Sequence, residues 1–287
     1  MREIAIVSSV RTAVGKSKRG NLKDTRPDDL MGIALKGAME AAGIDPADLD
    51  DVVVGTAFPE AEQGMNVART AGFRAGIPAY VPAMTVNRFC SSGLQSIAQA
   101  ASAIMAGWQD IVVAGGVESM TQIPMGGQKP SPNPTIMTED PALYTPMGIT
   151  AEIVAERFNV TREEQDAFSL RSHEKALAAQ ADGKFDDEII PVATRVYKNG
   201  EWKDIVVDKD EGPRGGSTME GLAKLKPPFK LGGTVTAASS SQVSDGAAAA
   251  VITTKEIAEE KGLPILALLK SYQVVGVDPS IMGVGPL

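Results

Sequence analysis

The one cysteine of this 287-residue chain, Cys90, is the side chain best suited to nucleophilic chemistry. It stands in the stretch Asn87–Leu94 (NRFCSSGL), between a short apolar segment and a run of small residues with helical spacing. A thiol at a helix N-terminus faces unpaired N–H groups and the positive end of the helix dipole, both of which favour the thiolate, and Arg88 adds a positive charge. The small residues Ser91–Gly93 leave room for a carbonyl, and the Cys90 amide can donate to an oxyanion. The alternative is that a lone cysteine serves as a small buried hydrophobic residue.

A nucleophilic cysteine ordinarily needs a base, and the sequence offers no obvious one. The only histidine, His173, lies among charged residues in Arg171–Lys175, which favours a solvated surface histidine over a catalytic one. Glu118 ends an apolar segment, where a carboxylate can orient or deprotonate a neighbour. A carboxylate in that place is as often a satisfied structural hydrogen-bond acceptor.

Two flexible stretches are candidates for ligand binding. Gly232–Gln242 is small and hydroxylated enough for the amides of a ligand to lie against it, although composition alone favours a Ser/Gly linker. Arg214 lies in a loop with Pro213, Gly215 and Gly216, where a cation can pair with a phosphate. An ordinary surface arginine is the alternative for that position.

The elements that must position these residues alternate between strand and helix. Short apolar, β-branched segments predict strands at Ile4–Val10, Val52–Gly55, Met84–Val86, Asp110–Ala114, Ala247–Thr253 and Ile265–Val275. Apolar residues at helical spacing predict helices at Asp28–Ala42, Gly64–Gly76 and Cys90–Trp108. Because parallel strands need crossover connections, this alternation predicts an α/β fold with a largely parallel sheet covered by helices on both faces.

The stretch 119–244 has a different texture, rich in proline, glycine and polar residues, and is expected to be a loop domain inserted into the α/β core. Thr161–Glu164 is a capping box that predicts a helix to about Ala181. The candidate buried positions of that helix are Phe168, Leu170, Ala176 and Leu177. Val192–Asp208 predicts a hairpin with Asn199-Gly200 at its turn. The expected organisation is an α/β core at 1–118 and 245–264 with the loop domain at 119–244 inserted into it.

Composition narrows the class of protein. With 43% hydrophobic residues the chain can bury a core, and 5% aromatic residues beside 29 glycines favour α/β over an aromatic all-β core. The formal net charge of −8 disfavours nucleic acid as a partner. A single cysteine excludes a disulfide framework and a cysteine zinc cage. No segment is an uninterrupted apolar span or a signal peptide, so the expected partners include no membrane and the expected location is cytoplasmic.

Several motifs resemble those of the thiolases, the CoA-dependent acyltransferases that cleave 3-ketoacyl-CoA or condense acetyl-CoA. The motifs are Val10–Thr12 with Gly15-Lys16, Thr85–Gln95, Gly115–Met120, Glu163–Phe168, Ser244–Ala249, Val277–Pro279 and Met282–Pro286. The resemblance implies a thiolase-fold half at 1–118 and 245–264, with a five-stranded, mostly parallel mixed sheet between helices, and 265–287 as the first strand of a truncated second half. It also implies Cys90 as the residue that takes the acyl group, acyl-CoA and CoA as substrates, and no permanently bound cofactor. It places the CoA contacts on Arg214 at the nucleotide end, on Met147 and Phe229 in the pantetheine groove, and on Ala237 and Ser241 at the pantetheine amides.

Departures from the family pattern set further expectations. Ala238-Ser239 stand where members commonly have Gly-Asn. The family takes its catalytic His, a second Cys and an oxyanion-hole Asn from a second half, so the resemblance implies that this chain is an N-terminal portion, inactive in turnover by itself. An exposed apolar surface and self-association, as a dimer or tetramer, are expected to follow.

The open alternatives are a non-catalytic CoA-binding or interaction fragment, and a redox thiol, which the lack of a resolving Cys disfavours. The stretches Phe89–Gln95 and Gly126–Pro130 resemble degradative 3-ketoacyl-CoA thiolases of fatty acid metabolism more than biosynthetic acetoacetyl-CoA thiolases.

Overall fold

A computed structural model describes residues 2–287 of the chain, which divide into two compact units. Among the described residues, the first unit comprises 2–129, Phe185–Gly212 and Val243–Tyr272, and the second comprises Pro130–Lys184, Pro213–Gln242 and Gln273–Leu287. These bounds differ from the expected loop domain at 119–244, because 119–129 and 185–212 belong to the unit that carries the sheet. The assignment of 265–287 to a further half stays a prediction.

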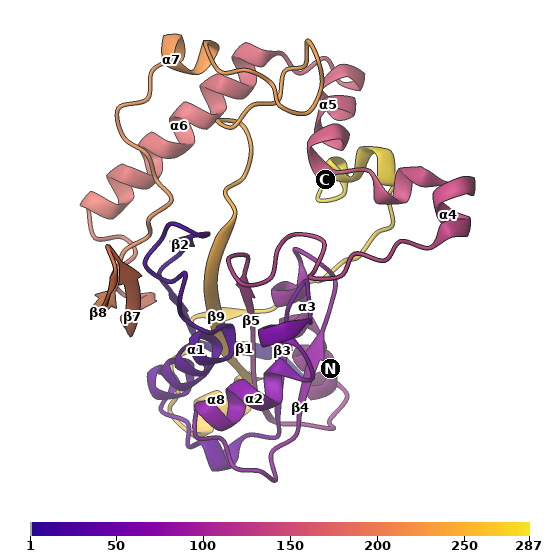
Figure 1. Cartoon of the computed structure of the whole chain (residues 1–287). Coiled ribbons are helices and arrows are strands. Elements are labelled where there is room, and N and C mark those ends of the chain that lie inside the picture. The colour runs from indigo at the N-terminus through magenta and orange to yellow at the C-terminus, as the bar shows by residue number, and fades with distance from the viewer. Residues whose placement is uncertain (1) are drawn as a thin grey trace. The chain divides into compact units, whose positions relative to one another are not determined.

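The first unit is built on one mixed sheet, whose strands are labelled in Figure 1 except for the two-residue strands β6 and β10. Its strands are β1 (Ile4–Thr12), β2 (Gly15–Lys16), β3 (Asp51–Gly55), β4 (Ala83–Val86), β5 (Ile111–Ser119), β6 (Ile189–Ile190), β9 (Ser244–Thr254) and β10 (Ala267–Leu268). The order is β10-β1-β9-β5-β3-β4, with β9 antiparallel to both β1 and β5 and with β3 parallel to β4 and β5. Four of the five main strands therefore run the same way, which confirms the predicted α/β class and mostly parallel mixed sheet.

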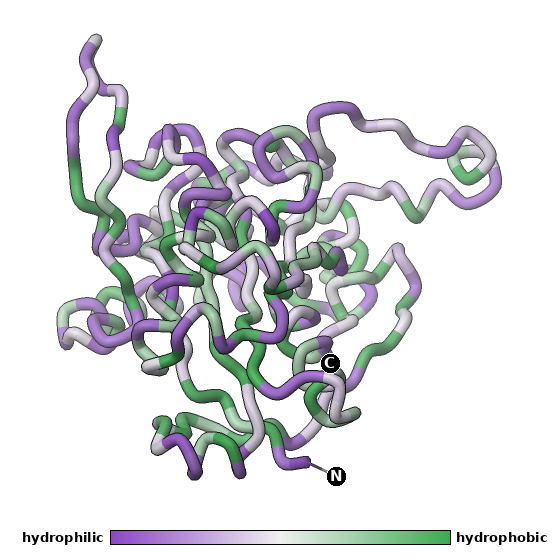
Figure 2. The backbone as a smooth tube through the Cα atoms, turned by 90° about the horizontal axis from the view of Figure 1, so that it is seen from below, coloured by the Kyte–Doolittle hydropathy of each residue, from purple (hydrophilic) through white to green (hydrophobic). Residues whose placement is uncertain are grey.

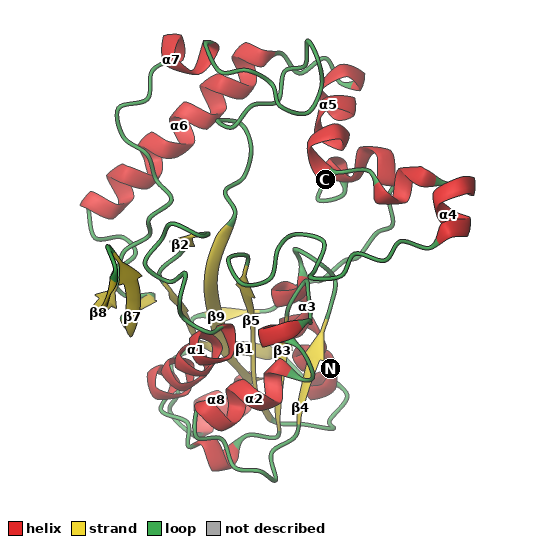
Figure 3. Ribbon diagram, viewed as in Figure 1, coloured by secondary structure: helices red, strands yellow, loops and turns green. Residues whose placement is uncertain are grey.

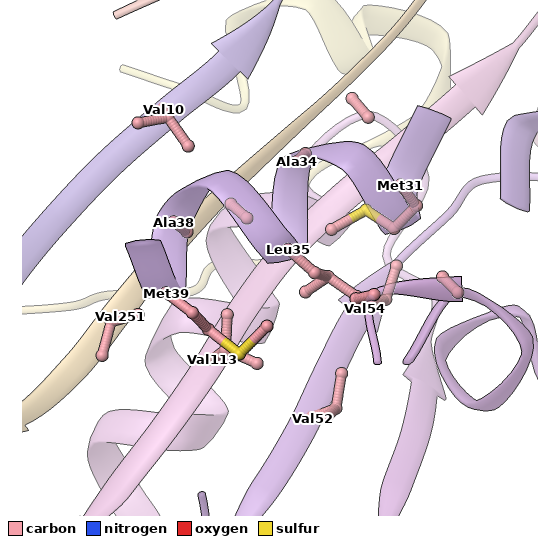
Figure 4. Close-up of a cluster of buried hydrophobic side chains, with 14 of the residues drawn as sticks. Val10, Met31, Ala34, Leu35, Ala38, Met39, Val52, Val54, Val113 and Val251 are labelled. Atoms are coloured by element: carbon pink, nitrogen blue, oxygen red, sulfur yellow. The ribbon is translucent and has the colours of Figure 1, made fainter. Parts of the chain in front are cut away.

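Helix α1 (Pro27–Ala42) covers one face of this sheet. It begins with Pro27 in its first turn and ends at Gly43, whose φ of 70° is the left-handed conformation that glycine adopts without strain. Its apolar stripe, including Met31, Leu35 and Met39, lies over valines of β3, β5 and β9 (Figure 4). The bounds and the glycine stop agree with the sequence prediction. Helices α2 (Val67–Arg74) and α8 (Lys255–Glu260) pack on the same core.

Helix α3 (Ser92–Met105) packs against the sheet through a second, smaller cluster. This cluster joins Ala101 and Ile104 of the helix to Val53, Val112 and Ile252 of three neighbouring strands. Figure 2 colours the trace by hydropathy, with its hydrophobic stretches in green. Because consecutive strand residues point to opposite faces, each central strand supplies one apolar set to α1 and another to α3. This explains why β3 and β5 read as continuous apolar runs.

The hairpin of the first unit follows its sequence prediction. Strands β7 (Val192–Lys198) and β8 (Glu201–Val207) pair antiparallel about the two-residue turn Asn199-Gly200. Both turn residues have positive φ, 54° and 87°, as a type I′ turn requires.

The segment after β8 is tied to β1 by Arg11. Its guanidinium makes two hydrogen bonds to the Asp210 carboxylate, at 2.7 and 2.9 Å, and a third to Glu188. Burial acts to raise the pKa of Asp210, but hydrogen bonds from Arg11 and the Val14 amide, with the Arg11 charge, hold that pKa below its ordinary value. The folded state therefore gains stability from ionised Asp210.

Asp210→Asn is expected to lower the free energy of unfolding by about 1–3 kcal/mol near neutral pH. A lowered folded pKa gives stability that is present above the unfolded pKa of about 3.9 and is lost as the pH falls through the folded pKa. The difference between wild type and variant should therefore shrink below about pH 4. Urea unfolding at several pH values measures it. Asp204→Asn is the control, since the Asp204 side chain is 88% exposed in its pair with Arg195. Equal losses in both variants would contradict the argument.

The second unit is mostly helices and loops (Figure 3). Its helices are α4 (Pro134–Glu139), α5 (Met147–Arg157), α6 (Arg162–Ala181) and α7 (Met219–Ala223), with short 3-10 turns η3 (Pro141–Tyr144) and η4 (Pro279–Val284). Helix α6 begins at the predicted capping box, with Thr161 and Glu164 each bonded to the other's backbone N–H. The prediction of a buried Phe168 is wrong: this ring is 65% exposed, while Asp166 and Ser169 of α6 are buried instead.

The predicted strand Ile265–Val275 is also wrong in its extent, because only Ala267–Leu268 forms β10. These two residues pair antiparallel with Ala5 and Ile6, and the Leu269 amide bonds to the Ile4 carbonyl. Because the pairing is antiparallel, the chain after Leu269 has passed Ile4, the first residue of β1, so the following apolar residues have no residues of β1 to pair with. Sequence pattern alone does not reveal where a partner strand stops.

Candidate active site

Cys90 lies in the turn that joins β4 to α3, and its side chain is exposed. The preceding residue, Phe89, has a φ of 45°, a conformation that a bulky residue seldom adopts. The Phe89 ring lies 6.2 Å from that of Phe58, centroid to centroid. Exposure and an unusual backbone favour the nucleophile over the alternative of a buried hydrophobic cysteine, since strained residues concentrate at functional sites.

Hydrogen bonds within the turn hold this conformation. The buried Ser92 hydroxyl donates to the Phe89 carbonyl at 2.6 Å and accepts from the Arg88 amide at 2.8 Å. The Ser91 hydroxyl donates to the Arg88 carbonyl at 3.0 Å. The two serines next to Cys90 therefore shape the turn as well as leaving space beside the thiol.

Close packing of glycines seats the first turn of α3 on the sheet. A Cβ at Gly55 would overlap the backbone of Ser92 and Gly93, and a Cβ at Gly116 would lie 3.1 Å from the Gly93 Cα. Gly55 and Gly116 are paired neighbours on β3 and β5. The absence of side chains at these two positions lets the helix that carries Cys90 approach the strand ends directly.

Arg88 is held against α3. Its Nε donates to the Gln95 Oε1 at 2.7 Å, and the Tyr272 hydroxyl donates to the same oxygen at 2.7 Å. The Arg88 guanidinium thus has the side-chain amide of Gln95, in α3, as a hydrogen-bond partner. Sequence reasoning did not single out Gln95 or Tyr272, because the three residues are brought together only by the fold.

Sequence reasoning also missed Asn87, which lies within the motif around Cys90. Its Nδ2 donates to the Ala57 carbonyl at 3.0 Å, and its Oδ1 accepts from the Phe89 amide at 2.8 Å. An asparagine directly after a strand and two residues before a backbone turn is a signal for this local hydrogen bond.

The five residues expected to contact CoA, namely Met147, Arg214, Phe229, Ala237 and Ser241, all belong to the second unit. Within that unit a cavity of about 580 Å³ has mostly apolar walls. Its lining includes Met147, Val154, Gln165, Phe168, Ser239 and Met282. Phe229 lies against Gly148, where an added Cβ would overlap its ring. Met147 and Phe229 are therefore at adjacent places near the start of α5.

The Gly232–Gln242 stretch is anchored to α5 by a buried carboxylate. Glu152 accepts hydrogen bonds from the amides of Thr234 and Val235 at 2.8–3.0 Å. Beyond that anchor, Thr236 accepts from the Ser240 amide and hydroxyl, which closes a tight turn. Ala237 and Ser241 are exposed at this turn. The segment is thus an ordered loop held by hydrogen bonds, and not a free linker.

Arg214 is exposed and lies beside the only histidine of the chain. Its backbone amide donates to the His173 Nδ1 at 3.2 Å, so the second unit brings these two residues together. Cys90 belongs to the first unit and His173 to the second. The described residues hold no group of three or more His, Cys, Asp or Glu side chains arranged for a metal ion. Among them, no helix is both long and apolar enough to cross a membrane.

Comparison with known proteins gives a family match over most of the chain. Residues 4–256 match the family described as "Thiolase, N-terminal domain". The chain is 50% identical to the 3-ketoacyl-CoA thiolase of Bacillus subtilis (strain 168), covering all of this chain and 75% of that protein. It is 49% identical to the peroxisomal 3-ketoacyl-CoA thiolase 1 of Arabidopsis thaliana, covering 99% of this chain and 65% of that protein. The chain thus spans just under two thirds of the plant relative's length.

A solved structure agrees with the sequence matches. The crystal structure of the Bacillus anthracis acetyl-CoA acetyltransferase superposes with a TM-score of 0.88 at 40% identity, covering 99% of this chain and 74% of that one. The resemblance drawn from the motifs is therefore confirmed at the level of the family and the fold. The chain belongs to the thiolase family.

Proposed function

We propose that this chain carries the acyl-accepting part of a 3-ketoacyl-CoA thiolase, with Cys90 as the nucleophile. The observation that carries the proposal is the exposed Cys90 thiol at the start of α3, in a turn held by its neighbouring serines. The names of the curated relatives favour 3-ketoacyl-CoA cleavage, a reaction of fatty acid degradation, over acetoacetyl-CoA synthesis.

In the proposed reaction the Cys90 Sγ attacks the 3-keto carbon of the substrate. The bond between carbons 2 and 3 then breaks and its electron pair goes to carbon 2. That carbon gains one proton, which balances the proton lost by the Cys90 thiol, and acetyl-CoA leaves. The shortened acyl group stays on Sγ as a thioester until the thiol of a second CoA attacks it and frees the cysteine. The Cys90 backbone N–H is proposed to donate to the oxyanion that forms in each attack.

The second unit is proposed to bind CoA. The apolar cavity beside Met147 suits a pantetheine chain, the exposed Ala237 and Ser241 present the loop to its amides, and Arg214 supplies a cation for a phosphate. The proposal assigns no step to a metal ion or to a permanently bound cofactor, and CoA takes part as a substrate. The expected self-association as a dimer or tetramer stays a prediction.

Arg214→Ala is expected to weaken binding of CoA by about tenfold, because it removes one charge-assisted contact to a phosphate. Pantetheine has no nucleotide or phosphate, so its binding should not change. Isothermal titration of both ligands on wild type and variant measures the difference. Because the Arg214 contact to His173 is made by the backbone, it survives the substitution. Equal weakening for both ligands would show that Arg214 shapes the loop instead of pairing with a phosphate.

The proposed function is tested by incubating the purified chain with acetoacetyl-CoA and measuring the intact mass. A single acetyl group on Cys90, located by peptide mapping, is the expected result. Single-turnover acylation is the suitable assay, because it needs the nucleophile and oxyanion donor but not repeated proton transfer. Tight CoA binding without acylation would support the non-catalytic CoA-binding alternative and overturn the proposal.

A further inference from the structure

Glu118, at the end of β5, makes its hydrogen bonds to the backbone and side chains that follow β3. Its Oε2 accepts from the Ala57 amide at 2.7 Å, and its Oε1 accepts from the Thr56 hydroxyl at 3.2 Å and the Gln63 Nε2 at 2.5 Å. Thr56 and Gln63 are almost fully buried. One half-buried carboxylate thus fixes the peptide between Thr56 and Ala57.

From that point a short chain of contacts leads to the nucleophile. The Ala57 carbonyl accepts from the Asn87 Nδ2, and the Asn87 Oδ1 accepts from the amide of Phe89, the residue before Cys90. Phe89 is also the residue with the strained φ of 45°. A strained conformation persists only where surrounding contacts over-determine it, and these contacts do so from the sheet side of the turn.

We propose that Glu118 is a positioning residue for Cys90, acting through Ala57 and Asn87 to hold the Phe89 peptide and so the direction of the thiol and the Cys90 amide. The proposal rests on the proposed function in that it assigns Cys90 the acyl-accepting role. Glu118 does not touch the substrate and takes no proton in this scheme. Its proposed role is to hold the backbone on which the nucleophile stands.

The surroundings of Glu118 require an acceptor at both of its oxygens. The Gln63 Oε1 accepts from the Ser119 amide at 2.6 Å, which fixes the orientation of the Gln63 amide and points its Nε2 at Glu118. Glutamine at position 118 has only one oxygen. It must therefore set an N–H group against either the Ala57 amide or the Gln63 Nε2, although its size and shape match glutamate. Glu118→Gln is thus a small change that breaks the contact chain at a known place.

The experiment compares wild type, Glu118→Gln, Asn87→Ala and the double variant. Asp51→Asn is the matched control, since Asp51 is a buried carboxylate at the opposite end of β3 with partners away from the turn. Hydrogen–deuterium exchange of the Phe89 amide, followed by NMR, reads the turn directly. Single-turnover acylation by acetoacetyl-CoA is stopped at set times and measured over a range of substrate concentrations. This separates the acylation rate constant from the substrate dissociation constant.

Glu118→Gln should exchange the Phe89 amide about tenfold faster and acylate about tenfold more slowly, with the dissociation constant unchanged. Asp51→Asn should match wild type in both measurements, even where its melting temperature falls. In the Asn87→Ala background, Glu118→Gln should have almost no further effect, because both act through one chain of contacts. Additive losses, or a Glu118→Gln protein that behaves like Asp51→Asn, would overturn the proposal.

The two measurements keep this inference apart from the proposed function. Failure of wild-type protein to become acylated would contradict Cys90 as the acyl acceptor. The exchange rates of the Phe89 amide would still decide whether Glu118 holds the turn. Normal acylation of wild type with unchanged exchange and acylation in Glu118→Gln would leave the proposed function standing and remove the positioning role.

Discussion

Replacing Cys90 by alanine is expected to leave no acyl group on the chain after incubation with acetoacetyl-CoA, whereas wild type carries one. The thioester needs a sulfur nucleophile, and the described chain has no other cysteine to supply one. Because the thiol is exposed rather than packed in a core, its removal should change the melting temperature by little. Intact-mass spectrometry measures the adduct, and the loss should be complete within detection.

Ser91→Ala is the matched control for this variant. Ser91 is the exposed neighbour of Cys90, and its hydroxyl makes one hydrogen bond, to the Arg88 carbonyl. Its loss should slow acylation by no more than about fivefold, the size of one ordinary hydrogen bond. An acyl group on the Cys90→Ala protein, wherever it is found, would show that another side chain is the acceptor. The Cys90→Ala protein should bind CoA with the same dissociation constant as wild type.

Gly55→Ala is expected to lower the free energy of unfolding by about 3 kcal/mol and to abolish acylation with it. The added methyl group would overlap the backbone of Ser92 and Gly93, and backbone atoms cannot turn aside as a flexible side chain can. The first turn of α3 must move off the sheet, and Cys90 moves with it. Thermal unfolding followed by circular dichroism, together with the acylation assay, measures both effects.

Gly72→Ala makes the same chemical change, but it is expected to raise the free energy of unfolding slightly. Gly72 lies in α2, and a Cβ there would meet Ile77 atoms at 3.9–4.0 Å, which is ordinary contact. Alanine in a helix interior is favoured over glycine by about 0.5–1 kcal/mol, so this variant should be slightly more stable and fully acylated. A Gly55→Ala protein as stable as Gly72→Ala would refute the close approach of α3 to β3.

The sequence predicted those elements whose signals are local. The hairpin turn at Asn199-Gly200 and the stop of α1 at Gly43 each depend on a few adjacent residues, and both are confirmed. The place of β9 between β1 and β5 has no local signal, because strand order depends on which apolar faces meet in the folded chain. For the same reason the strand expected at Ile265–Val275 could not be delimited from composition.

The residues of the candidate site likewise fall into those with a local sequence signal and those without one. Cys90 stood out because its residue type and its place before a helix are readable from adjacent residues. The roles proposed for Met147, Phe229, Ala237 and Ser241 came from the family resemblance, since none of these side chains has a chemistry that by itself indicates a ligand. The contacts that hold the turn join residues 57, 63, 87 and 118 from separate strands and loops, and only the fold brings them together.

The division into two units has a practical meaning for anyone who wishes to exchange parts between relatives. The chain passes from one unit to the other after residues 129, 184, 212, 242 and 272, so the second unit is formed by three separate segments of the chain. Grafting it onto another member's sheet unit therefore needs five sequence junctions instead of the two that suffice for an ordinary insertion. Substitutions at single lining positions such as Met147 or Phe168 are the simpler way to change the cavity of the second unit.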